Sequence, residues 1–208
     1  MFSGFYRCKG KCAGMKNLLC FMLFVLLIVG CSKPREKVIV LQPFGDFPKA
    51  EGHIVLEKIK KTNPNVILRK NLPFPTEAWY QPRNRYRADI LLKHLRKMAG
   101  NDTVMVGLSQ KDISTEKGKI KDWGVMGLGY QPGKACVVST FRLSDKNRSA
   151  QFYKVVLHEL GHTQGLPHCP GKSCFMRDAE GGNPLDDEIA FCASCKNYLA
   201  LCNWKLKS

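Results

Sequence analysis

The sequence predicts an α/β domain, bordering on α+β, whose core is a mostly parallel mixed sheet. Short runs rich in Val and Ile alternate with longer segments in which apolar residues recur at helical spacing, an alternation typical of parallel sheets covered by helices. The last long helical segment carries three of the chain's five histidines on it or directly after it. A chain of 208 residues has room for one well-buried domain of this kind.

The first 30 residues have the layout of a targeting segment rather than of a domain. Basic residues precede an apolar run, Leu18 to Val29, which is shorter than the about 20 residues that a membrane-spanning helix needs. The run ends in Leu27-Ile28-Val29-Gly30-Cys31, which resembles the lipobox of bacterial lipoproteins. That resemblance implies a cleaved lipoprotein signal peptide, residues 1–30, and lipidation of Cys31; an uncleaved signal anchor is the alternative. Either implies an extracytoplasmic, membrane-anchored protein of the bacterial cell envelope.

The charge of the chain points to no nucleic-acid partner. Lys and Arg number 33 against 17 Asp and Glu, for a net charge of +16, but the basic residues are spread along the whole sequence. A nucleic-acid interface gathers its bases on one face or in one run. We therefore expect a solvated basic surface and a monomer, with binding to an anionic polymer as a weaker alternative.

A short polar tether, residues 31–36, leads into a domain that spans residues 37–208, and the domain begins with a strand, a helix and a second strand. Lys37 to Leu41 is a Val/Ile-rich run closed by a proline and a glycine, which predicts a buried strand. Pro48 to Lys61 has apolar residues at helical spacing and is stopped by Asn63-Pro64. Asn65 to Leu68 is the second expected strand.

A proline-containing loop then leads to a second helix and a third strand. Arg87 to Met98 places its apolar residues on one face and ends before Gly100, which predicts a helix. Thr103 to Leu108 is an apolar run of strand length. The order strand–helix–strand–helix–strand favours parallel pairing, because each helix carries the chain back across the sheet.

The remaining expected elements are a hairpin and a long helix. Trp123 to Tyr130 and Ala135 to Phe141 are extended runs separated by the turn signal Gln131-Pro132-Gly133, so we expect one antiparallel strand at an edge of the sheet. Ser149 to Gln164 has an apolar stripe at helical spacing and predicts the helix that carries the histidines.

Residues 158–169 read HELGHTQGLPHC and predict a catalytic zinc site. His158 and His162 stand one helical turn apart on the same face, a spacing that suits two ligands of one zinc ion. Gly165 permits the turn that ends the helix, so that His168 can supply a third ligand. Three protein ligands leave one open position, as in catalytic sites. A bare HExxH can also be an ordinary helix surface, but the added glycine and third histidine argue against that.

Glu159 lies beside the first ligand and predicts a general base. A carboxylate next to a metal-activated water can accept its proton and later pass that proton to the leaving amine. The expected reaction is hydrolysis of peptide bonds. The alternative is a lipoprotein that binds zinc without catalysis, for which a base beside the metal would have no use.

Four cysteines after the histidine motif form a second group: Cys169, Cys174, Cys192 and Cys195. Two pairs separated by a loop have the spacing of a structural zinc site with four thiolate ligands. Disulfides are the alternative, and an extracytoplasmic location would favour them. The states of Cys136 and Cys202 stay open.

Together the two groups resemble the archaemetzincin family of metzincin-type zinc metallopeptidases, whose signature is HExxHxxGxxHCx4CxM followed by CxxC. Here it stands as HELGHTQGLPHCPGKSCFM and FCASC, with a segment between Met176 and Cys192 that is shorter than usual. The likeness spans roughly residues 37–202 and includes the segments PRNRYRA, residues 82–88, and CVVSTFRL, residues 136–143. In the first of these, Arg85 stands in place of a glutamine.

This resemblance implies a compact metzincin-like domain with a small zinc-stapled C-terminal part. It also implies two zinc ions, one catalytic and one structural, and a methionine turn at Met176 beneath the catalytic metal. The substrate is a peptide or protein whose identity and cleavage preference the sequence does not reveal. The glycine-containing run Trp123 to Tyr130 is a candidate edge along which a peptide could lie in extended form.

Overall fold

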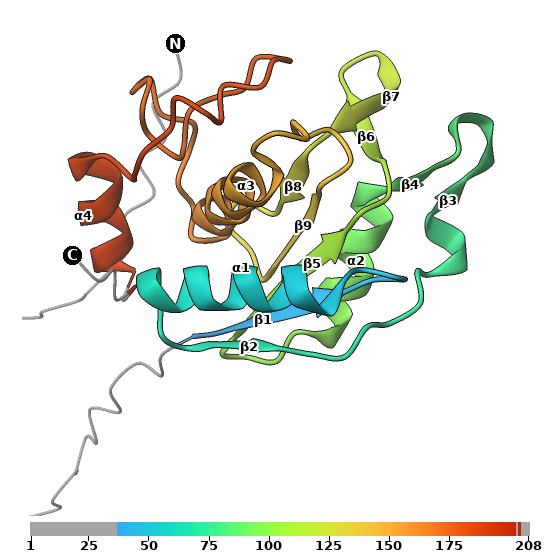
Figure 1. The fold of residues 1–208 in the computed structure, drawn as a ribbon, viewed down its shortest axis with the longest axis horizontal. Coiled ribbons are helices and arrows are strands. Elements are labelled where there is room, and N and C mark those ends of the chain that lie inside the picture. Colours follow the sequence, from blue (N-terminus) through green and yellow to red (C-terminus); the bar gives the residue numbers. More distant parts are fainter. Residues whose placement is uncertain (1–36, 203, 205–208) are drawn as a thin grey trace, which may run out of the picture. The chain divides into compact units, whose positions relative to one another are not determined.

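The computed structural model describes residues 37–202 and residue 204. The predicted signal peptide, the tether and Cys31 lie outside these residues. Within them, no helix is long and apolar enough to cross a membrane. The expected mixed α/β domain is confirmed, with one sheet of five strands and a second of four (Figure 1).

The five-stranded sheet has the order β2-β1-β5-β9-β8. Its first four strands are parallel and β8 runs antiparallel to β9 at one edge, as the hairpin prediction required. The bounds of the five strands are β1 Val38–Pro43, β2 Val66–Leu68, β5 Thr103–Ser109, β8 Gly127–Gly129 and β9 Ala135–Ser139.

Helices cover both faces of this sheet (Figure 1). Alternate residues of β1 show the two faces, since Ile39 and Leu41 pack against α1 and α3, whereas Val40 packs against α2. The apolar runs of the sequence are thus buried on both sides, as expected for parallel strands. The helix bounds are α1 Lys49–Thr62, α2 Ala88–Met98 and α3 Arg148–Thr163.

The second sheet corrects the sequence prediction. The run Trp123 to Tyr130 is not one strand: β7 ends at Val125 and β8 begins at Gly127, and the two strands belong to different sheets. Local alternation could not reveal this break, because both pieces are half-buried and extended. The second sheet has the order β3-β4-β6-β7, with β3 Trp79–Tyr80, β4 Arg85–Arg87, β6 Ile113–Lys117 and β7 Ile120–Val125.

Three short elements complete the described chain. Two 3₁₀ turns, Thr76–Ala78 and Gln81–Arg83, flank β3. A further helix, α4 Ala193–Leu201, follows the last cysteine pair and was not predicted. Leu199 on α4 and Trp204 after it are buried in the same apolar cluster as α1 and α3. The C-terminal segment therefore shares the core of the domain.

Candidate metal and catalytic site

Helix α3 and the turn after it bring the three predicted histidines together. His158 and His162 project from the last turns of α3, and their Nε2 atoms are 3.0 Å apart. Gly165 has φ +99°, a conformation that favours glycine, and it turns the chain so that His168 faces the other two. One ligand atom from each imidazole lies within 4.8 Å of the others.

The second nitrogen of each imidazole has an acceptor. His158 Nδ1 donates to the carbonyl oxygen of Phe175 at 2.7 Å, and His162 Nδ1 donates to that of Leu166 at 2.8 Å. His168 Nδ1 lies 3.0 Å from the Asp178 carboxylate. With the proton held at Nδ1, each Nε2 offers its lone pair to a shared cation.

The chemistry of this donor set fits zinc. Burial and the neighbouring imidazole of His162 lower the pKa of His158 to about 4, and burial also lowers the pKa of His162. Neutral imidazole is the form that binds zinc, and three imidazoles leave one position of a tetrahedral site open. Without a cation, the lone pairs of the converging Nε2 atoms would repel one another.

Glu159 lies beside the histidines in an apolar setting. The residue is buried, and its Oε2 has no hydrogen-bond partner among the described residues. Burial raises the pKa of its carboxyl to about 8, and a cation at the imidazoles would act in the opposite direction. A Cβ built on Gly127 of β8 would lie 2.6 Å from Glu159 Oε1, so the edge strand passes directly over this carboxyl.

Met176 lies beneath the same turns of α3. It is fully buried, and a Cβ added at Gly161 would come within 2.4 Å of its Sδ atom. The close approach of the helix to this methionine therefore requires glycine at position 161. Met176 also accepts, through its carbonyl oxygen, a hydrogen bond from the backbone N–H of Cys169 at 2.7 Å.

The four predicted cysteines form a second group whose sulfur atoms lie within 4.8 Å of one another. The Sγ atoms of Cys169 and Cys192 are 3.7 Å apart, and those of Cys174 and Cys195 are 3.8 Å apart. Two sulfur ligands of a tetrahedral zinc, each about 2.3 Å from the metal, lie about 3.8 Å apart, whereas a disulfide bond measures about 2.05 Å. Both sulfur separations fit ligands of a shared zinc ion and are longer than a disulfide bond.

The described residues include two further cysteines, which do not pair with each other. Cys136 is a free thiol fully buried in β9. Cys202 lies at the end of α4, with its Sγ 3.8 Å from the carbonyl oxygen of Gln164.

A cleft of about 760 Å³ opens over the histidines and Glu159. Strands β7 and β8 form one wall, which includes Trp123 to Gly129 of the predicted run Trp123 to Tyr130. The segment from Arg177 to Leu185 forms the other wall. Arg142 and Glu188 are among the charged residues of the cleft that the sequence did not single out.

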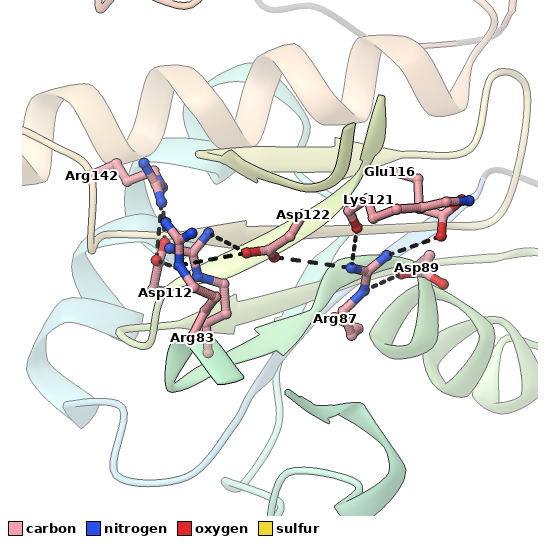
Figure 2. Close-up of polar contacts among 9 residues, drawn as sticks. Arg83, Arg87, Asp89, Asp112, Glu116, Lys121, Asp122 and Arg142 are labelled. Atoms are coloured by element: carbon pink, nitrogen blue, oxygen red, sulfur yellow. Dashed lines mark hydrogen bonds and ion pairs between the residues drawn. The ribbon is translucent and has the colours of Figure 1, made fainter. Parts of the chain in front are cut away.

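A network of ion pairs holds the β7 wall in place (Figure 2). Arg142 donates two hydrogen bonds to Asp112, at 2.8 and 3.0 Å, and Arg85 Nε lies 3.1 Å from the same carboxylate. Figure 2 shows Asp122 between this group and Arg87, and Arg85 Nη1 lies 3.4 Å from Asp122. The alternation of Arg83, Arg85 and Arg87 was the signal that could have pointed to this network.

Comparison with known protein families gives one assignment. The model of peptidase family M54 matches residues 47–200. The archaemetzincin of Methanopyrus kandleri is 33% identical over 137 residues, covering 64% of this chain and 76% of that protein. The archaemetzincin of Halobacterium salinarum is 30% identical over 169 residues, covering 74% of this chain and 94% of that protein.

Solved structures agree with the sequence matches. The crystal structure of the Methanopyrus kandleri archaemetzincin has a TM-score of 0.69 and 29% identity, covering 81% of this chain and 97% of that one. The archaemetzincin of Archaeoglobus fulgidus, crystallised in complex with malonate, has a TM-score of 0.66 and 25% identity, covering 77% and 98%.

Proposed function

This chain belongs to peptidase family M54 and is a zinc metallopeptidase, and on that premise we propose that Glu159 is its general base. We assign His158, His162 and His168 as the ligands of the catalytic zinc. The observation that carries the assignment is the convergence of three imidazoles whose Nδ1 atoms are already engaged. Beside them lies a buried carboxyl oxygen that has no partner in the described part of the chain. Zinc, when bound, supplies a Lewis acid that acidifies water and polarises a carbonyl group.

In this proposal the side chains of the chain itself move the proton. Glu159 accepts a proton from the attacking water and returns it to the leaving amine. Its position under Gly127 places the carboxyl at the edge strand β8, where an extended peptide could add as a further strand. Burial of Glu159 excludes bulk water from the proton that it holds.

The four cysteines are proposed to hold the structural zinc. Backbone N–H groups of Gly171 and Met176 point at the sulfur atoms of Cys169 and Cys174, at 3.4 and 3.5 Å. Donors of this kind stabilise thiolates, the form that binds zinc. The site would join the turn after α3 to the start of α4.

The test of the proposed mechanism separates metal binding from catalysis. Glu159→Gln keeps the shape of the carboxyl but cannot accept a proton, so it should keep its zinc and lose at least about a hundredfold in kcat/KM. His158→Ala should lose zinc as well as activity. A Glu159→Gln protein with full zinc content that still cleaves peptides at the wild-type rate would contradict the general-base assignment and favour another role for the site.

We also propose that the chain is a lipoprotein, held to a membrane of the cell envelope through Cys31. The support is the Leu27 to Cys31 lipobox behind a basic segment and an apolar run. Cys31→Ser should abolish incorporation of labelled fatty acid and shift the protein out of the membrane fraction. Unchanged labelling of this variant would refute the lipid anchor.

A further inference from the structure

Glu188 is a buried carboxyl in the substrate cleft that the mechanism does not use. Its exposed fraction is 3%, yet it is one of the residues that line the cleft. Oε2 of Glu188 has no hydrogen-bond partner among the described residues. A buried polar atom without a partner is rare in folded proteins, because its lost hydration is not compensated.

The cations nearest to Glu188 are engaged elsewhere. Lys154 donates to the carbonyl oxygen of Leu185 at 2.5 Å, and Arg177 donates to Asp187 and to the carbonyl oxygen of Lys172, both at 3.3 Å. Burial raises the pKa of Glu188 to about 7, against the opposing effect of Lys154 and Arg177. Lys154 and Arg177 therefore favour the charged carboxylate from a distance, while Oε2 has no donor among the described residues.

Glu188 shares its cleft with residues that lie close to the histidines along the chain. Val155 and Leu185 line the same cleft, and Val155 precedes His158 by three residues on α3. Three residues of helix correspond to about 5 Å along the axis. A side chain of the substrate that reaches the region of Val155 therefore belongs to a residue close to the scissile bond.

We propose that Glu188 forms the end of a subsite that selects a basic side chain, Lys or Arg, within two residues of the scissile bond. This inference rests on the proposed function. The methylene stem of Lys or Arg can lie against Val155 and Leu185, while its charged end donates to the Glu188 carboxylate. Binding of substrate then gives Oε2 of Glu188 the donor that it lacks among the described residues. An acidic side chain would meet like charge at the same place.

The test is a set of peptides that are identical except at the positions flanking the scissile bond, where Lys or Arg is replaced by norleucine or glutamine. One charge-assisted hydrogen bond corresponds to about a tenfold change or more, so kcat/KM for the best basic peptide should exceed that for norleucine at least about tenfold. In Glu188→Gln this ratio should fall to near one. Cleavage of the norleucine peptide is the reference within each protein, so the ratio does not depend on the overall activity of Glu188→Gln.

Glu116→Gln is the matched control. Glu116 lines the opposite wall of the same cleft but is exposed, so its substitution removes the same charge without touching the subsite. The Glu116→Gln protein should still cleave the basic peptide faster than the norleucine peptide. Zinc content and thermal unfolding of both variants check that the fold is intact. A ratio that stays high in Glu188→Gln, or a wild-type protein that does not distinguish the peptides, would overturn the subsite.

Binding measurements keep this test apart from the test of the mechanism. In the Glu159→Gln background, a fluorescent basic peptide should bind at least about tenfold more tightly than its norleucine counterpart, and adding Glu188→Gln should remove the difference. Discrimination in binding without cleavage by the wild-type protein would uphold the subsite and contradict the proposed catalytic role. Cleavage by a protein that binds both peptides equally would uphold the proposed catalytic role and contradict the subsite.

Discussion

At the scale of single residues, the three histidines differ in how firmly they are held. His158 and His162 donate to backbone carbonyls that the fold keeps in place, whereas His168 is paired with the side chain of Asp178. The His168 and Asp178 side chains are 46% and 51% exposed. The orientation of His168, the third proposed ligand, therefore depends on one exposed carboxylate. The backbone N–H of Glu180 holds the pKa of Asp178 below its usual range, so this carboxylate is ionised at neutral pH.

Removal of the Asp178 carboxylate should weaken the catalytic zinc. We expect Asp178→Ala to lower zinc affinity about 10- to 100-fold, because an acceptor at Nδ1 orients the ring and raises the basicity of Nε2. Competition with a chelator measures this. Asp178→Asn keeps an acceptor oxygen and should lose less. Asp187→Asn, at an exposed acid nearby, is the control, and equal affinity in Asp178→Ala and the wild type would disprove the role of this pair.

At the scale of elements, the active site depends on how closely β8 approaches α3. The space between Gly127 and Glu159 does not admit a side chain, since a Cβ there would lie 2.6 Å from Oε1. Gly127 also pairs with Val138 of β9, which limits how far the strand can move. The distance between β8 and Glu159 is therefore determined by the pairing of β8 with β9 and by the packing of α3.

Gly127→Ala should lower activity without unfolding the domain. The added methyl group must push either β8 or the Glu159 carboxyl aside, and a displacement of about 1 Å in an active site can cost about a hundredfold in rate. Gly182→Ala is the control, because a Cβ there meets only the carbonyl oxygen of Ala179 at 3.4 Å in the same cleft. If peptidase assays find the two variants equally active, the close contact between Gly127 and Glu159 does not matter for catalysis.

The second sheet depends on the buried carboxylate of Asp112. Its side chain is 7% exposed and pairs with Arg85, which is 9% exposed, and with Arg142 from the cleft wall. Loss of one partner of a buried ion pair leaves the other charge without compensation and costs about 3 to 5 kcal/mol. The network of Figure 2 should therefore be sensitive to the loss of Asp112.

Asp112→Asn should lower the free energy of unfolding by about 3 kcal/mol, because it leaves the Arg85 guanidinium without its closest carboxylate. Urea unfolding of the zinc-loaded protein measures the change. Asp145→Asn removes an exposed partner of Arg148 and should change stability by less than about 0.5 kcal/mol. Equal effects of the two substitutions would contradict the importance of burial here.

At the scale of the whole domain, the C-terminal segment has few regular hydrogen bonds of its own. Between α3 and α4 it forms only isolated bridges among the described residues, Cys169 with Arg177 and Cys174 with Ala190. Phe175, Phe191 and Trp204 from this segment nevertheless pack in the main core. A metal that joins its two ends would therefore stabilise both the segment and the turn that carries His168.

We expect two zinc ions per chain, and Cys195→Ser should reduce this to one. Loss of the structural zinc should lower the melting temperature, because metal binding and folding of such a segment are coupled. Metal analysis and calorimetry measure both effects. The His158→Ala protein should also hold one zinc but melt closer to the wild type. A wild-type protein with a single zinc would rule out the proposed pair of sites.

The sequence by itself determined the features that depend on short spacings along the chain. A separation of four residues on a helix is enough to place His158 and His162 together, and the pattern of valines and isoleucines is enough to identify β1, β5 and β9. The cysteine spacing predicted the second group of proposed ligands in the same way.

Only the tertiary structure decided which distant segments meet. The break at Met126, the acceptors of the three imidazoles and the isolation of Glu188 in the cleft all depend on pairing and packing between remote parts of the chain. The run Trp123 to Tyr130 has the same extended pattern whichever sheet each half joins, because β preference reflects the neighbours that a strand finds. The spacing of residues along the chain determines which side chains share one face of a helix or strand. The packing of the whole domain determines which distant residues lie against that face.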